Sequence, residues 1–167
     1  MADGARVGLG SGRAASAFIA LLGARRRKGF VVSGVPTSKA SAELARQVGV
    51  PLIELGVGGI LDLTVDGADE VTPDLDLVKG WGGALVRERI VAAASARQVI
   101  LIGEEKLVPT LGARGRIPVE LVALGVWSAT RSIQALGLTP TRRSVADGAR
   151  PFLTENGNAI IDCALAA

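Results

Sequence analysis

The chain has 167 residues, of which 49% are hydrophobic, and its formal net charge is +3 at pH 7. This length and hydrophobic content allow a sizeable core, so the composition excludes an intrinsically disordered protein. Histidine is absent and Cys163 is the only cysteine, which excludes a disulfide framework, a cysteine-cluster metal site and histidine-dependent catalysis. Any chemistry must therefore use carboxylates, lysines, hydroxyls or backbone amides.

The sequence shows neither a membrane segment nor a secretion signal. It has no run of about 18 apolar residues, and its N-terminus lacks the basic-then-apolar pattern of a signal peptide. We therefore expect a cytoplasmic protein without a membrane partner. The basic cluster at residues 25–28 has no interleaved aromatic residue for stacking on bases. It is better explained as the solvated end of a helix, and no nucleic-acid partner is expected.

Strands and helices are predicted to alternate through residues 1–116. Strands are predicted at 7–10, 30–32, 51–55, 61–65 and 99–102, and helices at 14–22, 38–47 and 85–96. Apolar strands that alternate with helices of about ten residues are typical of a parallel sheet with right-handed crossovers. The sequence therefore predicts a doubly wound, mostly parallel, Rossmann-like α/β domain over residues 1–116.

The pattern changes after Ile117. Strands are predicted at 118–122, 140–144 and 159–164, with a helix at 127–136 and an Asn156-Gly157-Asn158 turn before the last strand. This β-α-β-β order predicts the start of a small ferredoxin-like α+β unit, which needs another helix and strand for completion. We therefore expect a partial, truncated small domain over residues 117–167.

The first candidate binding segment is the glycine turn Gly8–Arg13, between a predicted strand and a predicted helix. Backbone amides at a helix N-terminus can bind an anion there. A dinucleotide fingerprint would place a third glycine at Arg13 and an acidic residue about twenty positions further on, and both are missing. A simple phosphate is therefore favoured over a nicotinamide cofactor.

The second candidate is the acidic segment Asp66–Glu70, which follows the predicted strand at 61–65. Ligands of open α/β sheets bind beyond the carboxyl ends of the strands. Aspartates are also common in turns, where they accept hydrogen bonds from neighbouring amides. That structural explanation suffices for a single aspartate, but the cluster in this position favours a functional role.

The third candidate is the segment Lys79–Glu88, in which a lysine and a glycine-rich loop precede a predicted helix. A lysine beside loop amides is a second arrangement that suits an anion. Glu88 lies in the first turns of the helix and could point back toward the loop. Alternatively, Glu88 is an ordinary surface carboxylate paired with Arg87 or Arg89, an interaction worth little.

Together these segments resemble the ribose-5-phosphate isomerase A family, in the same order and at similar spacings. The matching residues are Gly8–Gly12, Gly34–Ser38, Val65–Val71, Lys79–Leu85, Arg87–Arg89, Pro118–Glu120, and Asp162 after the Asn156-Gly157-Asn158 turn. The family consists of cofactor-free enzymes of the pentose phosphate pathway that interconvert ribose 5-phosphate and ribulose 5-phosphate. The resemblance implies this activity, with a sugar phosphate as the partner and with neither metal nor organic cofactor.

The resemblance also implies roles for individual residues. Glu88 lies where the family has its proton-shuttling general base. Asp66, Asp69 and Lys79 lie where the family binds the sugar, assists ring opening and stabilises charge. Further substrate-binding positions are implied at Ser11, Gly12, Arg13, Ala14, Gly67, Ala68, Gly80, Trp81, Gly82 and Lys106. We expect a homodimer or a homotetramer.

Three positions differ from the family pattern. Arg13 and Ala14 replace hydroxyl residues that are usual in the phosphate loop, and Trp81 replaces a residue that is often glycine. The guanidinium of Arg13 could supply charged donors in place of the lost hydroxyls.

The implied reaction agrees with the residues that the chain offers. One carboxylate can move a proton between adjacent carbons of an aldose through a cis-enediolate. Lys79 and loop amides can stabilise the developing oxyanion. The alternative is a sugar-phosphate-binding module without catalysis, which would not require Glu88 together with Asp66, Asp69 and Lys79.

Overall fold

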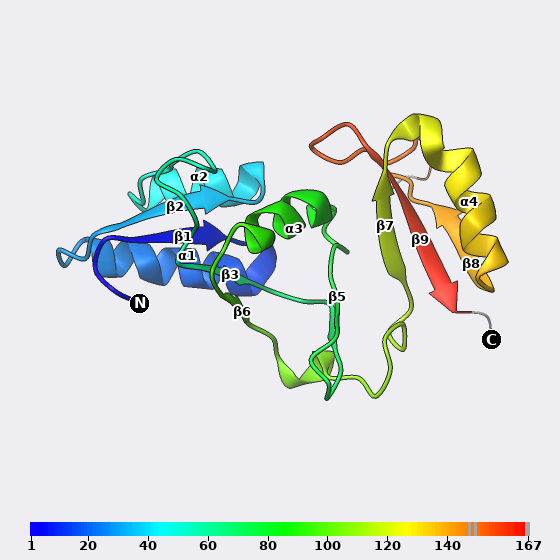
Figure 1. Ribbon diagram of the computed structural model, residues 1–167, viewed down its shortest axis with the longest axis horizontal. Coiled ribbons are helices and arrows are strands. Elements are labelled where there is room, and N and C mark those ends of the chain that lie inside the picture. The colour runs from blue at the N-terminus through cyan, green and yellow to red at the C-terminus, as the bar shows by residue number, and fades with distance from the viewer. Residues whose placement is uncertain (147, 149, 166–167) are drawn as a thin grey trace. The chain divides into compact units, whose positions relative to one another are not determined.

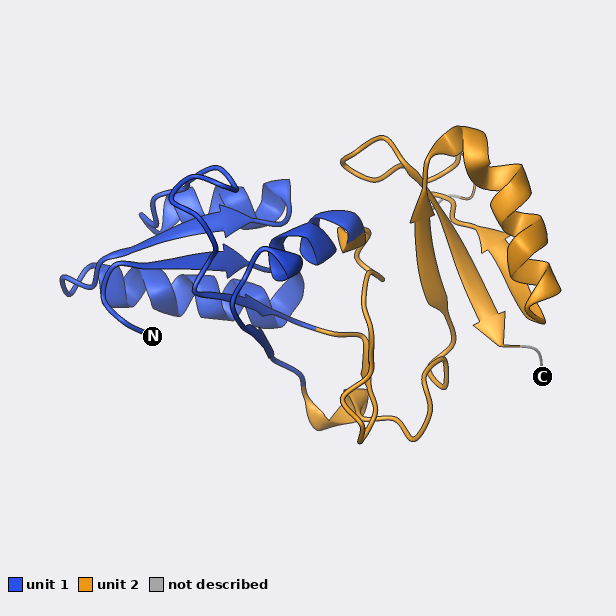
Figure 2. Cartoon of the chain, viewed as in Figure 1, with its two compact units in different colours: residues 1–67, 86–102 blue, residues 68–85, 103–167 orange. Residues whose placement is uncertain are grey.

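The computed structural model describes residues 1–146, 148 and 150–165. The chain forms two compact units, which Figure 2 shows in different colours. Unit 1 comprises Met1–Gly67 and Val86–Ile102, and unit 2 comprises Ala68–Leu85 and Gly103–Ala167. The units are therefore interleaved along the chain, and a domain boundary after residue 116 remains a prediction.

Unit 1 is built on a four-stranded parallel sheet (Figure 1). Its strands are β1 (Ala5–Leu9), β2 (Val32–Pro36), β3 (Leu63–Asp66) and β6 (Gln98–Ile100). The strand order is β2-β1-β3-β6, and all three neighbouring pairs run parallel. This sheet confirms the predicted doubly wound α/β class and aligns the carboxyl ends of β1 and β3 at one edge.

Helices cover both faces of this sheet. Ile19 of α1 (Gly12–Arg26) and Ala45 of α2 (Lys39–Gln47) share a core cluster with Val7 of β1. Val91 of α3 (Leu85–Ala93) belongs to a different cluster, with Val35 of β2. Because Val32 of β2 is in the first cluster, alternate β2 side chains pack on opposite faces, as the pleat requires.

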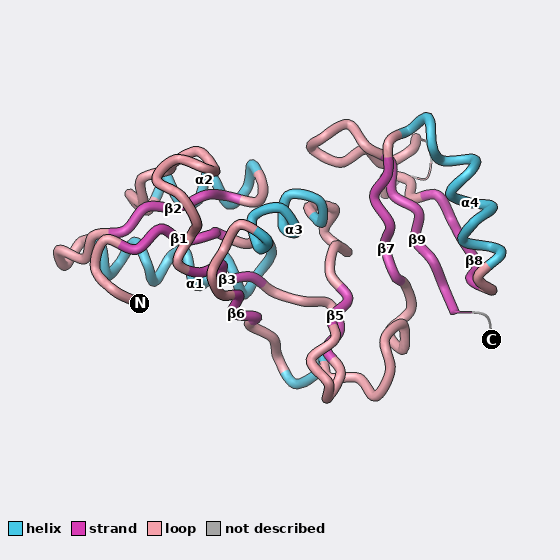
Figure 3. Tube along the Cα trace, viewed as in Figure 1, coloured by secondary structure: helices cyan, strands magenta, loops and turns pink. Residues whose placement is uncertain are grey.

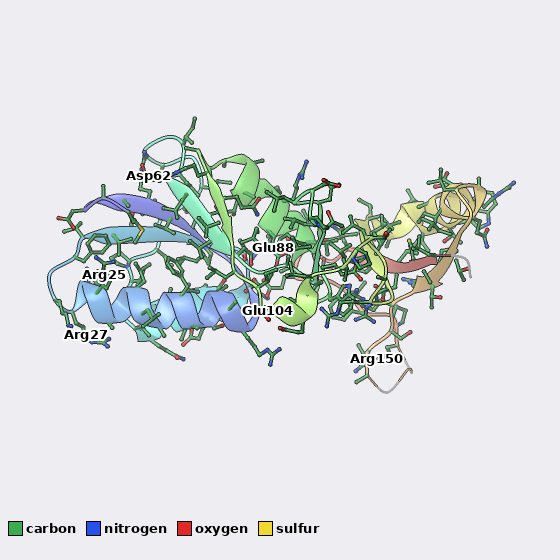
Figure 4. All side chains as sticks on the ribbon, turned by 90° about the horizontal axis from the view of Figure 1, so that it is seen from below. Arg25, Arg27, Asp62, Glu88, Glu104 and Arg150 are labelled. Carbon is green, nitrogen blue, oxygen red and sulfur yellow. The ribbon has the colours of Figure 1, made fainter. Side chains whose placement is uncertain are left out.

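The helix ends explain two sequence features. Ser38 caps α2 through a capping box with Ser41, which fixes the start of that helix where the sequence predicted it. The basic cluster at residues 25–28 lies in and just after the last turn of α1, where Figure 4 labels Arg25 and Arg27. Cations are favourable at this negative end of the helix dipole, so the cluster has the structural explanation that was expected.

Unit 2 contains two antiparallel sheets joined by long loops (Figure 3). Its elements are β4 (Glu70–Val71), β5 (Leu77–Val78), η1 (Glu104–Lys106), β7 (Ile117–Leu121), η2 (Ala123–Gly125), α4 (Val126–Ala135), β8 (Leu138–Arg142) and β9 (Ala159–Leu165). The larger sheet has the order β7-β9-β8, with β9 antiparallel to both neighbours. This is the split β-α-β arrangement that opens a ferredoxin-like unit.

Three strand predictions differ from the structure. The strand predicted at 51–55 is wrong, because only Leu52 forms a bridge there, to Gly34. The strand predicted at 30–32 begins at Val32 and continues to Pro36, at the edge of the sheet where proline is tolerated. The β4–β5 hairpin was not predicted, since its two-residue strands are too short to show a period.

Within the described residues, no helix is both long enough and apolar enough to cross a membrane.

Candidate active site

The glycine turn of unit 1 is held by Asp66. This residue ends β3, beside the end of β1, and its side chain is only 1% exposed. Its Oδ1 atom accepts hydrogen bonds from the backbone N–H groups of Ser11 (3.0 Å) and Gly67 (2.8 Å). Asp66 therefore fixes the entrance of α1, and the structure brings it together with predicted binding residues on both sides.

The approach of Asp66 explains why residue 10 is glycine. A Cβ atom at Gly10 would lie 2.2 Å from the Asp66 Oδ1 atom and 2.6 Å from its Cα atom. Both contacts are far below van der Waals distance, and one involves backbone. A side chain at position 10 would therefore displace Asp66 from the loop.

Thr37 is a part of this site that was not among the candidate residues. Its side chain is fully buried, and its Oγ1 atom donates to the Leu9 carbonyl oxygen (3.1 Å). The Ser11 Oγ atom lies 2.8 Å from the Thr37 Oγ1 atom. Since the single Thr37 hydroxyl hydrogen is directed to Leu9, Ser11 is the donor of the second bond. Thr37 could have been identified as a candidate because it lies in the Gly34–Ser38 segment, which resembles the family.

The other predicted residues of this loop form the first turn of α1. Gly12 and Arg13 are exposed, Ala14 is half-buried, and the turn contains no acidic residue. Ser11 is the N-cap, and its side chain accepts no hydrogen bond from the helix. The first amides of α1 are thus presented at the positive end of the helix dipole, which suits an anion.

Glu88 is a buried carboxylate rather than a surface one. It lies in the first turn of α3, is 6% exposed, and has its Oε2 atom buried (Figure 4). This burial contradicts the alternative of an ordinary surface ion pair. Burial of a charged carboxylate costs free energy, so a buried Glu88 is better explained by a functional role than by a role in keeping the surface soluble.

Unit 2 joins Asp69 to the lysine loop, residues 79–83. The Asp69 Oδ2 atom accepts the backbone N–H of Trp81 (2.9 Å), and the Asp69 N–H donates to the Val78 carbonyl oxygen (2.7 Å). Lys79 follows β5 directly and is half-buried. The β4–β5 hairpin therefore brings Asp69 beside the loop that carries Lys79, Gly80, Trp81 and Gly82.

Lys106 is held against the same acidic segment. Its Nζ atom donates to the Ala68 carbonyl oxygen from the short helix η1. Ala68 is buried and Lys106 is half-buried. The structure thus unites two predicted binding residues that lie 38 positions apart.

Glu70, the third carboxylate of the segment, is structural. It is fully buried, and its carboxylate accepts the backbone N–H groups of Gly112 and Arg114, the latter at 2.6 Å. The Arg114 Nη1 atom in turn donates to the Asp69 carbonyl oxygen (2.7 Å). The amide-binding role that aspartates often have in turns therefore applies to Glu70, as it does to Asp66 and Asp69.

Trp81 is enclosed by residues that sequence analysis did not single out. The guanidinium carbons of Arg114 and Arg116 lie 5.5 and 5.3 Å from its ring. Its Nε1 atom donates to the Arg116 carbonyl oxygen (2.9 Å). No sequence motif indicates these arginines, because each lies at least 33 positions from Trp81 in the sequence.

The carboxylates among the candidate residues can transfer protons, and their cations and backbone amides can bind an anion. Unit 1 by itself contains two buried carboxylates, Asp66 and Glu88, and a glycine turn. Unit 2 by itself contains Asp69 and the cations of Lys79 and Lys106. Among the residues that the structure describes, no group of three or more His, Cys, Asp or Glu could hold a metal ion.

Comparisons with known proteins agree on one family. Residues 33–167 match the family described as ribose 5-phosphate isomerase A (phosphoriboisomerase A). A ribose-5-phosphate isomerase A of Roseiflexus sp. (strain RS-1) is 47% identical over 163 residues, covering 96% of this chain and 70% of the relative. One of Bacillus mycoides (strain KBAB4) is 46% identical over 161 residues, covering 96% of this chain and 72% of the relative.

Solved structures give the same result. A D-ribose-5-phosphate isomerase in complex with phospho-erythronic acid has a TM-score of 0.94 and 33% identity, covering 99% of this chain and 73% of that one. The ribose 5-phosphate isomerase A of Methanocaldococcus jannaschii has a TM-score of 0.92 and 38% identity, with coverage of 98% and 73%.

Proposed function

Because the chain belongs to the ribose 5-phosphate isomerase A family, we propose that it interconverts ribose 5-phosphate and ribulose 5-phosphate with Glu88 as the general base. The isomerase activity follows from the family, and the role of Glu88 is the proposal. The observation that carries it is the burial of Glu88 in the first turn of α3, directly after the lysine loop. The alternative of a non-catalytic sugar-phosphate-binding module is not favoured, since the similar proteins are isomerases.

The proposed reaction needs one proton carrier. In the open-chain aldose, the Glu88 carboxylate removes the C2 proton, the electrons of that C–H bond form the C1–C2 double bond, and the C1–O1 π electrons move to O1, which gives a cis-enediolate. The protonated Glu88 then returns its proton to C1, and the proton of the O2 hydroxyl passes to O1, so that O2 becomes the ketose carbonyl and O1 becomes a hydroxyl. A positioned base of this kind contributes about 10²–10⁴-fold in rate.

The enediolate oxygens require fixed positive partners. Lys79 and the amides of the lysine loop are proposed to stabilise the negative charge on O1. Asp66 and Asp69 are proposed to bind the sugar hydroxyls and to assist ring opening. The hydrogen bond from Trp81 to Asp69 supports this division, because it fixes the orientation of the Asp69 carboxylate beside the loop.

The phosphate is proposed to bind at the first turn of α1. Gly12, Arg13 and Ala14 present amides at the positive end of the helix, and Arg13 adds a guanidinium. Gly67, Ala68, Gly80, Trp81, Gly82 and Lys106 are proposed as further substrate contacts. The phospho-erythronic acid of the similar isomerase is a phosphorylated four-carbon acid, whose planar carboxylate resembles an enediolate. It is therefore the probe of choice for this chain.

The test of the proposal is Glu88→Gln, which keeps the shape of the side chain and removes the base. We expect kcat for ribulose 5-phosphate formation to fall by about two to four orders of magnitude, while calorimetric binding of phospho-erythronic acid survives. The assay contains a chelator and no nicotinamide. Turnover within about threefold of the unmodified enzyme would remove Glu88 from the mechanism.

Glu43→Gln is the matched control. Glu43 lies on the surface of α2, where its side chain is 62% exposed and forms an ion pair with Arg46. An exposed pair of this kind is worth little, so this substitution should leave both kcat and binding unchanged.

We also propose that the enzyme is a homodimer or a homotetramer in the cytoplasm. Exposed apolar residues of unit 2, Leu124 (95%), Trp127 (71%) and Leu136 (77%), support self-association. Phosphorylated sugars do not cross a bilayer unaided, which supports a location where they are made and used. Light scattering after size-exclusion chromatography measures the assembly, and a monomeric mass would contradict it.

A further inference from the structure

Arg143 connects the larger sheet of unit 2 to the lysine loop. It follows β8 directly and its side chain is 9% exposed. Its Nε atom donates to the Asp162 Oδ2 atom (2.8 Å), and its Nη2 atom donates to Oδ1 of the same carboxylate. A bidentate pair of this kind fixes the plane of the guanidinium. The remaining nitrogen, Nη1, is therefore aimed in one direction.

That direction is the backbone of the lysine loop. The Arg143 Nη1 atom donates to the Trp81 carbonyl oxygen (2.9 Å), with a longer contact of 3.5 Å to the Gly80 carbonyl oxygen. The N–H group of Trp81 donates to Asp69. The backbone of Trp81 is thus held at two points. Its N–H group is bound by Asp69, a residue proposed to bind the sugar, and its carbonyl group is bound by Arg143.

Phe152, which is hydrogen-bonded to Arg143, supports the loop further along. Gly83 has a φ of +85°, and a Cβ atom there would lie 2.8 Å from the Phe152 Cζ atom. The Phe152 N–H donates to the Arg143 carbonyl oxygen (2.9 Å), and its ring lies 5.7 Å from the Arg143 guanidinium. Arg143 and Phe152 therefore support the loop together, and they limit the positions that the loop between Lys79 and α3 can adopt.

We propose that Arg143, oriented by Asp162, is a positioning residue for the isomerisation. It holds the Gly80 and Trp81 carbonyls so that the neighbouring Lys79 and Asp69 meet the reacting end of the sugar. This inference rests on the proposed function of the lysine loop. A misplacement of about 1 Å can reduce a rate by about 10²-fold without abolishing binding. Arg143 is thus expected to affect kcat more than KM.

The test compares Arg143→Met with Arg142→Met, the adjacent exposed arginine of β8. Arg143→Met should lower kcat by about 10- to 100-fold, with KM for ribose 5-phosphate and the Kd of inorganic phosphate within about threefold of the unmodified values. Arg142→Met should change none of these. Arg143→Lys should restore part of kcat, because an ammonium can reach a carbonyl but lacks the fork for Asp162.

A spectroscopic measurement separates loop position from general stability. Trp81 and Trp127 are the two tryptophans of the chain, so Trp127→Phe leaves Trp81 as the reporter. In this background, Arg143→Met should increase acrylamide quenching of Trp81 at temperatures where the circular dichroism spectrum is unchanged. The positioning role is overturned if Arg143→Met lowers the melting temperature but changes neither kcat nor the quenching of Trp81. It is also overturned if Arg143→Lys does not fold and the quenching of Trp81 is unchanged in Arg143→Met.

The outcomes also separate this inference from the proposed function. An inactive Glu88→Gln with a fully active Arg143→Met would overturn the role of Arg143 alone. A fully active Glu88→Gln would overturn the proposed base, whatever Arg143→Met does.

Discussion

Asp66 and Glu70 are carboxylates of one short segment that bind backbone amides of different loops. The Asp66 Oδ1 atom accepts two loop amides, and the Glu70 carboxylate accepts two amides from residues 112 and 114. Substitutions at these positions therefore change backbone order as well as charge. Asp66→Asn can keep the Oδ1 acceptor and is the more informative substitution, whereas Asp66→Ala removes the support of the glycine turn.

Arg13 provides a test of the phosphate position. It is exposed at the second residue of α1, where a cation opposes the helix dipole unless an anion binds beside it. Arg13→Ala should raise KM much more for ribose 5-phosphate than for unphosphorylated ribose, and this difference should shrink at high salt. Arg27→Ala, at the other end of α1, is the control. Equal losses for both sugars would place the phosphate elsewhere and make Lys106 the next cation to test.

Cys163 gives the protein a pH-dependent stability in the alkaline range. The thiol is 1% exposed, and burial, with a smaller contribution from Asp162, raises its pKa above the ordinary value of 9.0. Well below pH 9.0 the thiol is protonated in both the folded and the unfolded state. Above it, the unfolded chain releases the proton first, so the free energy of unfolding falls as pH rises, by at most about 1.4 kcal/mol per pH unit.

Urea unfolding of the unmodified protein and of Cys163→Ala, each at pH 8 and pH 10, measures this effect. The unmodified protein should lose more stability between the two pH values than the variant does. The comparison cancels the lysines, which titrate in both proteins, and the chain contains no tyrosine. A loss of equal size in both proteins would show that the thiol does not contribute.

At the scale of elements, the sequence predicted the elements that have a clear period. The helices α1, α2, α3 and α4 and the strands β1, β3, β6, β7, β8 and β9 lie at or near their predicted positions. β2 was displaced because Ser33, Gly34 and Pro36 are typical of turns, yet they pair in register with β1. Its edge position accommodates Pro36, which sequence alone does not reveal.

The candidate site was predictable only where motifs carry it. The resemblance implied binding roles for Ser11, Asp66, Asp69 and Trp81, and hydrogen bonds join Ser11 to Asp66 and Trp81 to Asp69. Arg143 escaped notice because its partner Trp81 is 62 positions away and no local pattern marks it. Contacts of this length depend on the register of β8 and β9, which single-sequence patterns do not determine.

Gly8 tests the packing of α3 on the sheet. A Cβ atom at this position of β1 would lie 2.6 Å from the Val91 Cγ1 atom and 2.1 Å from the Thr64 Oγ1 atom. Both side chains are buried and branched at Cβ, so they cannot turn away freely. Gly8→Ala should lower the free energy of unfolding by about 1–3 kcal/mol in urea titrations.

Gly125→Ala is the matched control for this prediction. Gly125 has a φ of −82°, and an added Cβ would meet only Leu121, at an ordinary 3.7 Å. Its stability should change by less than about 0.5 kcal/mol. Equal stability of the Gly8→Ala variant and the unmodified protein would mean that α3 packs less closely on β1.

At the scale of the whole molecule, the chain passes between its two units after residues 67, 85 and 102. Asp66, Asp69, Glu88 and Lys106 all lie within four residues of these crossings. The Cα atoms of Asp66 and Asp69 can be at most about 11 Å apart, because three residues of extended chain span no more. The proposed substrate residues thus lie close in sequence to the points where the chain passes from one unit to the other.

A crystal structure with phospho-erythronic acid tests the proposed substrate contacts. We expect the ligand to contact Asp66, Asp69, Lys79 and Glu88. A ligand that contacts none of Asp69, Lys79 and Glu88 would contradict the proposed roles.

The support of the lysine loop also has a consequence for synthesis on the ribosome. The sheet of unit 1 has all its strands once Ile100 has been translated, whereas Asp162, which orients Arg143, follows 62 residues later. At about 5–20 residues per second this is an interval of several seconds. During that time the sheet of unit 1 can already be folded in the nascent chain, while residues 79–83 do not yet have their contacts with Arg143 and Phe152. The sheet of unit 1 would therefore be complete before residues 79–83 gain their contact with Arg143, and catalysis would begin only after β9 has been translated.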